Sequence, residues 1–268
     1  MRALVLLAPL LLLGGCGLFP AHNDSELYDA PWPDERLRRD DGTVDVSAFP
    51  LGTQVQLRFQ VIEGLEGARG FGLSSAIYVP LAMDLDPSSL PSLEQSTDPG
   101  SSVSLIDVDR ASPELGRRVP IDVRFTPETT PFAPARILSL LPQQGAPLRP
   151  ETLYAAVVTA RVRTSDGEPL HASERVTRIV RGRSDASLHA ISSYDEALAR
   201  LHELGVAASE LAELAVFRTG PDPALELRRA VAQALGDHLP AAGHAELIEE
   251  HPDYCVFETR LRMPVYQE

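Results

Sequence analysis

The chain contains no lysine and only two cysteines, Cys16 and Cys255, among its 268 residues. Its 24 basic residues are therefore all arginines, and 38 aspartates and glutamates outnumber them, which gives a net charge of -14. This charge argues against a nucleic-acid-binding protein and against electrostatic adhesion to anionic lipid, because both partners are themselves negative. The sequence also has no phosphate-cradling glycine loop and no basic patch with interleaved aromatic residues.

Long hydrophobic runs are absent as well. The longest, residues 3–13, is shorter than the roughly 20 residues of a transmembrane helix and has the length of a signal-peptide core. It follows Arg2 and ends in Leu13-Gly14-Gly15-Cys16. This pattern resembles the lipobox of bacterial lipoprotein signals, in which a peptidase cuts before the cysteine and the cysteine then carries lipid. The resemblance implies that residues 1–15 are a signal peptide and that Cys16 is lipidated.

A lipidated Cys16 implies a lipid-anchored protein of the cell envelope, whose membrane contact comes through the anchor. An Asp after the cysteine is the usual inner-membrane retention signal in this signal family, so Gly17 favours the outer membrane and leaves the periplasmic or surface side open. Cys255 then has no intramolecular disulfide partner. Its strand-like neighbours Tyr254, Val256 and Phe257 predict a buried free thiol.

Hydrophobic residues make up 44% of the chain, enough to bury a core. Residues 16–50 are polar and rich in turn formers, which predicts a tether that leads into a docked irregular segment. The only tryptophan, Trp32, lies between two prolines in this segment, and we expect it to pack onto the domain. Residues 51–66 fit both an alternating strand and a helical face.

Residues 70–182 consist of short stretches rich in β-branched residues, separated by clusters of Pro, Gly and Asp. This arrangement predicts an all-β sandwich. In residues 119–125, apolar residues alternate with Pro120, Asp122 and Arg124, which predicts one buried and one solvated face. The expected strands are 75–81, 103–109, 119–126, 136–141, 152–163 and, less regular, 175–180.

The period becomes helical after Arg183. Expected here are a helix at 194–204 that ends before Gly205, a short helix at 209–214, a strand at 215–219, an amphipathic helix at 223–239 and a strand at 254–263. The predicted fold class is mainly β with a helical extension, in which a β-sandwich at about 70–183 precedes a small α+β segment at 184–268.

Residues 70–171 resemble bacterial Ig-like domains of surface-layer and envelope proteins, so the sandwich is expected to be Ig-like. Asp86-Pro87 is expected to start a turn, Tyr154 to pack at a sheet corner, and Asp166-Gly167 to form a tight turn with positive φ. The matching text comprises residues 81–90, 103–107, 119–125, 147–154 and 166–170.

A wider resemblance covers nearly the whole mature chain, which looks like the N-terminal region of bacterial virulence-factor-type extracellular lipases and related lipoproteins. In that family an Ig-like domain precedes an α/β-hydrolase domain. The resemblance implies a helix at 51–66 and implies that residues 184–268 lead into a hydrolase domain. Its text comprises Phe49-Pro50, Gly70-Phe71-Gly72, residues 204–206, residues 215–220 and residues 259–266.

The catalytic part of that family is not recognisable in this sequence. A nucleophile elbow needs Gly-x-Ser-x-Gly between a strand and a helix. The nearest text, residues 72–76, lacks the final glycine and precedes an expected strand, so we interpret it as scaffold. The prediction is a non-catalytic envelope protein with a positioning or binding module. The alternative is the N-terminal piece of an extracellular lipase or esterase whose catalytic part lies outside this chain.

Metal and cofactor sites are not expected. His202 and Glu203 begin like a zinc helix but lack a second histidine at helical spacing, and His238, His244 and His251 are six or seven residues apart. Asp84, Asp86, Asp107 and Asp109 are candidate calcium ligands if strand ends bring them together, but no twelve-residue loop pattern is present and solvated turn carboxylates are favoured. The expected partners are therefore the membrane, through the lipid, and a hydrolase domain or another envelope protein.

Overall fold

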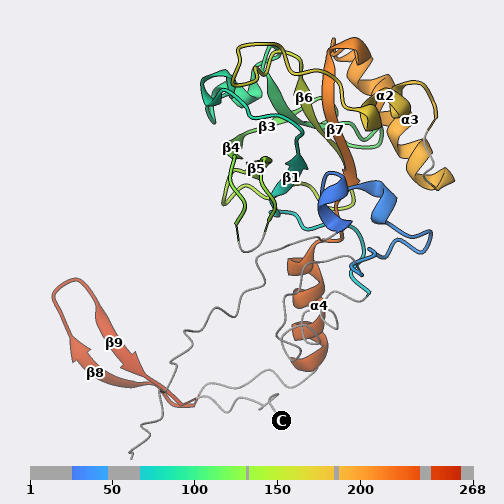
Figure 1. Ribbon diagram of the computed structural model, residues 1–268. Helices are drawn as coiled ribbons and strands as arrows, with labels where there is room; N and C mark the ends of the chain where they lie inside the picture. The colour runs from blue at the N-terminus through green and yellow to red at the C-terminus, as the bar shows by residue number, and fades with distance from the viewer. Residues whose placement is uncertain (1–25, 48–66, 131–132, 184–186, 236–242, 261–268) are drawn as a thin grey trace, which may run out of the picture. The chain divides into compact units, whose positions relative to one another are not determined.

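The computed structural model describes residues 26–47, 67–130, 133–183, 187–235 and 243–260 (Figure 1). The chain divides into two compact units, Met1–Pro221 and Asp222–Glu268, which are described separately below. The predicted signal peptide at 1–15, its Cys16 and the predicted helix at 51–66 lie outside the described residues.

Two antiparallel sheets form the first unit (Figure 1). The three-stranded sheet has the order β1 (Ile77–Pro80), β5 (Ile137–Pro142), β4 (Ile121–Thr126). The four-stranded sheet has the order β3 (Arg118–Val119), β2 (Val103–Asp107), β6 (Leu153–Thr159), β7 (Leu211–Arg218). The prediction of a mainly β protein is confirmed.

One stretch of chain passes from one sheet to the other at Pro120. The strand before it, β3, pairs with β2, whereas the strand after it, β4, pairs with β5. The proline has no backbone N–H to contribute to a ladder, so it suits a point where the pairing changes. In β4 the predicted alternation is present, since Ile121 is buried while Asp122 and Arg124 are exposed.

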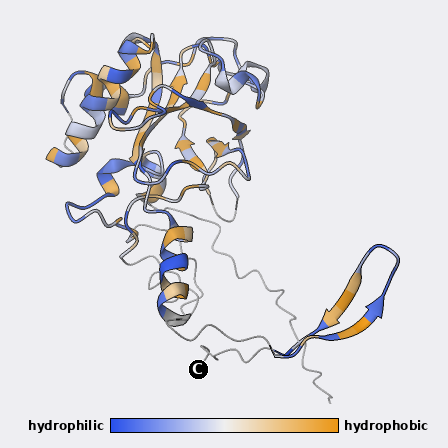
Figure 2. Ribbon diagram, turned by 180° about the vertical axis from the view of Figure 1, so that it is seen from behind, coloured by the Kyte–Doolittle hydropathy of each residue, from blue (hydrophilic) through white to orange (hydrophobic). Residues whose placement is uncertain are grey.

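Apolar side chains of both sheets form one core between them. Its members come from all seven strands and include Ile77, Leu105, Ile121, Leu138, Leu140, Tyr154 and Phe217. The other face of the four-stranded sheet is covered by helices α2 (Glu174–Val180) and α3 (Leu188–Glu203) through a second core. This double coverage explains why β2 and β6 are buried at every position, as in sheets with both faces packed. Figure 2 shows the resulting apolar strands.

Residues 175–180 are helical, so the strand predicted there is wrong. The hydroxyl of Ser173 accepts a hydrogen bond from the N–H of Val176 and caps the helix. Val176 and Ile179 lie three residues apart and both enter the second core. Helix α3 ends as predicted, since Gly205 follows it with φ +83° and the N–H of Val206 bonds to the carbonyl of Leu201.

The short helix predicted at 209–214 is also wrong. A 3-10 turn occupies Ala208–Glu210, and β7 begins at Leu211 and pairs with β6 along its whole length. Burial on both faces hides the two-residue period of this strand. Because β7 belongs to the four-stranded sheet, the first unit extends to Pro221, beyond the sandwich limit near residue 183 that the sequence predicted. Helices α2 and α3 lie in the connection between β6 and β7.

The second unit contains α4 (Pro223–Leu235) and an antiparallel hairpin of β8 (Glu246–Glu250) and β9 (Cys255–Glu258). The helix and the C-terminal strand were predicted near these positions, while β8 was not. Cys255 is exposed, which corrects the prediction of a buried thiol. All five residues of β8 are exposed and only Val256 of β9 is half-buried, so this hairpin gives its side chains little cover.

Candidate functional site

The segment Leu27–Ser47 packs against the rest of the first unit. Trp32 pairs with Tyr78 of β1 through backbone hydrogen bonds of 2.9 and 2.7 Å. Its ring meets the ring of Phe71 edge-on, with centroids 5.4 Å apart. The expectation that Trp32 packs onto the domain is therefore confirmed.

Asp34, two residues after this tryptophan, is completely buried. Its carboxylate accepts hydrogen bonds from the backbone N–H and the guanidinium of Arg36, at 2.9 and 3.0 Å. The hydroxyl of Tyr194 in α3 donates to the same carboxylate at 2.8 Å. Asp34 thus caps a 3-10 turn, Glu35–Leu37, and also joins the segment to α3.

Glu35 is completely buried too and connects the segment to two other elements of the unit, β7 and α3. Its carboxylate accepts the backbone N–H of Arg218 at 2.7 Å and the hydroxyl of Ser193 at 3.2 Å. The guanidinium of Arg38 lies 3.0 Å away, and Nε2 of His189 lies 2.8 Å away. Both carboxylate oxygens of Glu35 therefore accept hydrogen bonds inside the fold.

Arg175 of α2 neutralises acids on two sides. It forms an ion pair with Glu213 of β7 at 2.9 Å and lies 3.7 Å from Asp34. Burial alone would lower the pKa of Arg175, but Tyr194, Glu213 and Asp34 together raise it. Burial, followed by the charge of Asp34, raises the pKa of the Tyr194 phenol. Arg175 therefore stays charged and Tyr194 stays a neutral donor.

The sequence did not single out Asp34 or Glu35. The available signal was two consecutive acids beside Pro31 and Pro33, in a segment already expected to dock. What could not be predicted was their partners in α2, α3 and β7, which lie far away in the chain. We name the group formed by Asp34, Glu35, Arg175, Ser193 and Tyr194 the docking cluster.

The four candidate calcium ligands have separate structural roles. Asp84 forms an ion pair with Arg136 at 2.9 Å, and Asp86 caps a 3-10 turn at Pro87 as the predicted turn requires. Asp107 and Asp109 are buried, which corrects the expectation of solvated carboxylates. In the part of the chain that the structure describes, no group of three His, Cys, Asp or Glu residues is arranged to hold a metal ion.

Asp109 fixes the turn after β2. It accepts the N–H of Ala111 at 2.8 Å and the N–H of Leu153 at 3.0 Å, and it forms an ion pair with Arg218. Burial alone would raise the pKa of Asp109, but these hydrogen bonds and the Arg218 charge hold it below its ordinary value. Burial raises the pKa of the neighbouring Asp107, whose carboxylate accepts the Ser112 hydroxyl.

Tyr154 lies at the corner where the chain enters β6, as predicted. Its hydroxyl accepts a hydrogen bond from the backbone N–H of Arg149 at 3.0 Å, and burial raises its pKa to about 12. Its ring stacks with Phe217 of β7 at a centroid distance of 6.1 Å. The predicted tight turn is present as well, with Gly167 at φ +83°.

The segment before β1 and the segment after β7 cross closely, and a glycine of each, Gly70 and Gly220, lies at the crossing. Phe71 forms a parallel bridge with Thr219, and the N–H of Gly220 bonds to the Phe71 carbonyl at 2.8 Å. A Cβ on Gly220 would lie 2.2 Å from the carbonyl oxygen of Arg69. The Gly70-Phe71-Gly72 and Thr219-Gly220 motifs therefore lie against each other. Residues 72–76 lie directly before β1, in the setting that the sequence predicted for them.

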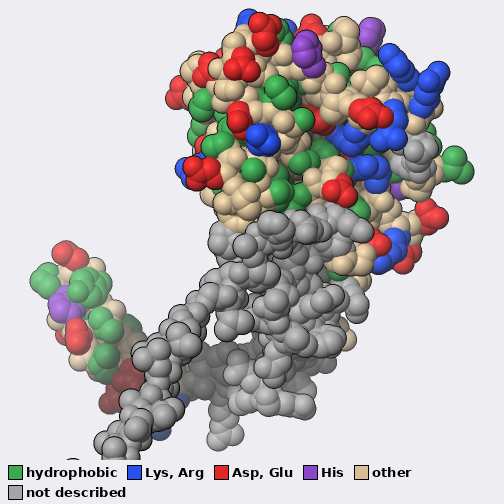
Figure 3. Space-filling view, in the orientation of Figure 1, with side chains coloured by type: hydrophobic (Ala, Val, Ile, Leu, Met, Phe, Trp, Pro, Cys, Tyr) green, Lys and Arg blue, Asp and Glu red, His purple; other side chains and the backbone are tan. Residues whose placement is uncertain are grey.

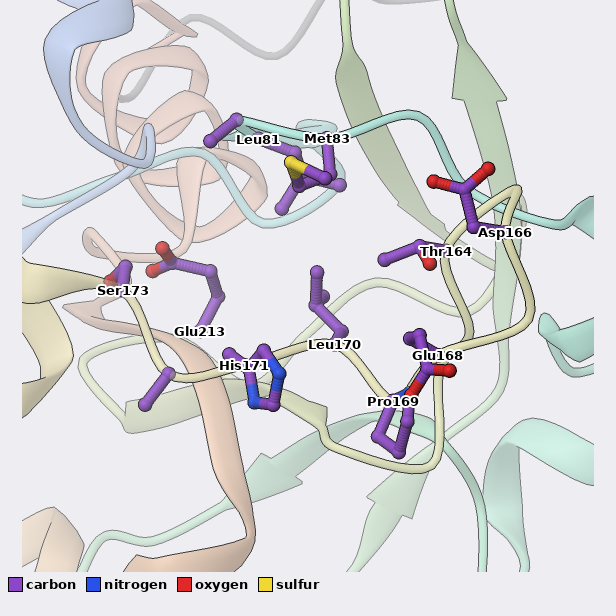
Figure 4. Close-up of a pocket in the computed structure, with 12 residues that line it drawn as sticks. Leu81, Met83, Thr164, Asp166, Glu168, Pro169, Leu170, His171, Ser173 and Glu213 are labelled. Atoms are coloured by element: carbon purple, nitrogen blue, oxygen red, sulfur yellow. The ribbon is translucent and has the colours of Figure 1, made fainter.

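A cavity of about 450 Å³ opens beside Met83 in the first unit (Figure 4). Leu81 and Met83 lie on one side and Leu170 on the other, with Glu213 at one end. The remaining lining residues are Ala82, Thr164, Asp166, Glu168, Pro169, His171, Ala172 and Ser173. The sequence did not predict this cavity, because its two loops are distant in the chain.

The four candidate zinc-binding histidines do not form a group. His202 is on α3 of the first unit, His244 and His251 are in the second unit, and His238 lies outside the described residues. His251 stacks on Tyr254 and contacts Glu249 at 3.0 Å.

On the face seen in Figure 3, acidic and arginine side chains are both scattered over the first unit.

No protein-family model matches the chain, and no curated protein is found to be similar to it. The Ig-like and lipase-type resemblances therefore stay predictions. Within the described ranges, no helix has the length and apolarity needed to cross a bilayer.

Proposed function

We propose that this chain is a non-catalytic, lipid-anchored protein of the cell envelope, whose Ig-like sandwich positions or binds a partner close to the membrane. The observation that carries the proposal is the docked segment. Glu26 starts the first described turn, ten residues after Cys16. Ten residues span at most ~36 Å even when fully extended. A lipid on Cys16 would therefore hold Glu26, at the start of the docked segment, within this distance of the bilayer.

The docking cluster attaches the N-terminal segment firmly to the domain. Asp34 and Glu35 are buried and bonded to α3 and β7, so a pull on the N-terminal segment is transmitted to the sandwich itself. Breaking a buried charge pair by removing one partner costs about 3–5 kcal/mol. Such a connection fixes where the domain sits relative to its anchor, which suits a positioning module.

Three features support the Ig-like assignment. The sandwich has a three-stranded and a four-stranded sheet, and the chain switches between them at Pro120. The order β3-β2-β6-β7 is that of an Ig-like sheet C′-C-F-G, and β1-β5-β4 is that of its partner sheet B-E-D. Tyr154 near the start of β6 bonds to backbone five residues upstream, like the tyrosine corner of strand F.

Membrane fractionation tests the anchor. Cys16→Ala should leave the chain uncleaved or release it from membranes, while the matched variant Cys255→Ala should fractionate like the wild type. Cys255 is exposed and lies in the second unit, so its removal leaves the first unit intact. Unchanged membrane association and unchanged mature mass in Cys16→Ala would contradict the proposal.

An activity assay tests the non-catalytic part. We expect purified protein to hydrolyse short and long acyl esters no faster than buffer. An esterase activity that a single serine replacement abolishes would refute this part, and Ser74 and Ser75 of the near-match to a nucleophile elbow are the first serines to replace.

The second candidate is the N-terminal region of a lipase-type protein. It is favoured by large apolar side chains that the second unit leaves exposed, among them Leu227 at 65%, Ile248 at 51% and Phe257 at 60%. In the resembling family these residues would lead into a hydrolase domain and be covered by it. The DNA beyond codon 268 discriminates the two, because a continuing frame with Gly-x-Ser-x-Gly would favour this candidate and unrelated sequence would favour the first.

A further inference from the structure

We propose that the outer edge of β4 pairs with the same edge of a second copy of this chain, so that their three-stranded sheets join into one continuous antiparallel sheet. This inference goes beyond the positioning role proposed above and does not depend on the lipid anchor. β4 is the last strand in the order β1-β5-β4, so one of its edges has no neighbouring strand in the described part of the chain (Figure 1). Such an edge presents N–H and C=O groups that can pair with another strand.

The other outer strands of the first unit are covered, at least in part, by neighbouring segments. On β1, Tyr78 and Trp32 exchange two backbone hydrogen bonds. On β7, the carbonyl of Ala212 accepts the N–H of Ser173 at 3.0 Å. β3 has only two residues. Among the described strands of this unit, β4 therefore offers the longest edge that no such segment covers.

Hydrogen bonds to β5 use only every second residue of β4. The N–H of Gln143, directly after β5, donates to the carbonyl of Pro120 at 2.9 Å. Because bonded and non-bonded pairs alternate in an antiparallel ladder, Asp122 and Arg124 direct their backbone groups toward β5. The backbone groups of Val123 consequently point toward the open edge.

Val123 and Phe125 supply the free backbone groups of this edge. The N–H of Ile121 also points outward, but it donates to the hydroxyl of Ser96 at 3.0 Å, which closes the start of the edge. Among the described residues, none forms a hydrogen bond with the outward groups of Val123 or Phe125. The side chains of these two residues pack against the core, so they need not move when a strand is added.

The charges of β4 select one register for this pairing. Asp122 and Arg124 are exposed, and the side chain of neither is bonded to another described residue. When the Val123 residues of two copies pair with each other, Asp122 of each copy lies opposite Arg124 of the other. The two nearest registers would instead place Asp122 opposite Asp122 or Arg124 opposite Arg124. Opposite charges across a strand pair stabilise it and like charges destabilise it, so this edge is self-complementary, as a two-fold interface requires.

Sedimentation equilibrium of the full chain tests the proposal, under reducing conditions because the thiol of Cys255 is exposed. At about 0.15 M salt, which screens the net charge of -14 on each copy, the wild type should dimerise as its concentration rises. We expect a dissociation constant of about 100 µM, because the interface is small.

Charge reversal tests the register. Asp122→Arg and Arg124→Asp should each weaken the dimer about tenfold, because each places like charges opposite each other on both sides of the two-fold axis. The double variant, Asp122→Arg with Arg124→Asp, restores both pairs and the net charge, so it should dimerise like the wild type. Unweakened dimers in the single variants, or no recovery in the double variant, would overturn the proposal.

Two further variants separate the edge from overall charge and from folding. Asp195→Arg makes the same charge change as Asp122→Arg at an exposed position of α3, and it should dimerise like the wild type. Val123→Pro removes only an outward N–H, so it should keep the melting temperature while it weakens the dimer at least about tenfold. Equal weakening in Asp195→Arg, or a wild type that stays monomeric at about ten times the expected dissociation constant, would overturn the proposal.

Discussion

The buried hydroxyl of Tyr194 donates a 2.8 Å hydrogen bond to the carboxylate of Asp34, joining residues that lie 160 positions apart. One belongs to the segment that follows the predicted tether, and the other to the helix that covers the four-stranded sheet. The bond therefore links the segment next to the predicted anchor to the folded domain. It also makes the N-terminal segment a part of the fold.

Tyr194→Phe should destabilise the first unit by about 1–3 kcal/mol, because Asp34 would remain buried with one donor fewer. The midpoint of urea unfolding measures this change. Tyr254→Phe is the matched control, since Tyr254 is 61% exposed and surface changes usually stay within about 0.5 kcal/mol. Equal midpoints for the two variants would show that the bond contributes nothing to docking.

Glu35→Gln should loosen the docked segment. The amide keeps the shape of the side chain but removes the charge that faces Arg38, and its NH₂ group would face donors such as the N–H of Arg218. We expect a loss of about 3–5 kcal/mol. Limited trypsin digestion gives a local readout, because Arg36, Arg38 and Arg39 should be cut rapidly only in the variant.

Glu128→Gln is the control for this digestion, because Glu128 is an exposed glutamate with no hydrogen bond to the segment among those the structure describes. Wild-type resistance in both variants would contradict the role assigned to Glu35. Rapid cutting in both would indicate a general loss of stability.

Stability should fall between about pH 10 and pH 12. The folded state holds the pKa of Tyr154 at about 12, against about 10 for an exposed phenol, and burial likewise raises that of Tyr194. The native state therefore keeps protons that the unfolded state releases. The contribution of these tyrosines is complete below pH 10 and is lost as the pH rises through the folded value.

Tyr154→Phe tests this assignment. It should cost about 1 kcal/mol at pH 7, through the lost hydrogen bond to Arg149, and should make the decline above pH 10 shallower than in the wild type. Unfolding free energies at pH 7, 9, 10.5 and 11.5 measure both effects. A decline as steep as in the wild type would mean that other groups govern the alkaline transition.

Gly220→Ala should cost more than Gly145→Ala. A Cβ on Gly220 would lie 2.2 Å from a carbonyl oxygen of the crossing chain, so the backbone itself must move. Gly145 has φ +86° but open space around it, so only the strain of about 1–2 kcal/mol is expected there. Comparing the two melting temperatures separates the cost of the crossing from that of the φ angle.

Five of the six strands expected before residue 183 could be predicted from the sequence, because turn residues at their ends and β-branched residues within them give a local signal. The caps at Asp86 and Gly205 and the corner at Tyr154 were predictable for the same reason. The errors fall where tertiary burial overrides this signal. In β7, burial on both faces removes the two-residue alternation, and in residues 175–180 the apolar positions fit either period.

The functional residues were less predictable. Asp34 and Glu35 look like surface acids in the sequence, and only the fold brings Tyr194, Ser193 and Arg218 to them. The residues that line the cavity beside Met83 come from stretches distant in the chain, which no local pattern brings together. Cys255 was misjudged because a strand-like run does not reveal whether a second layer covers it.

The central claim is that Cys16 is the lipidated first residue of the mature protein. The most direct test is the intact mass of the protein extracted from the membranes of cells that naturally produce it. The account predicts a polypeptide that begins at Cys16, with the added mass of a diacylglyceryl group and, where the cell supplies it, a third acyl chain. A mass that corresponds to residues 1–268, or an unmodified thiol at position 16, would contradict it.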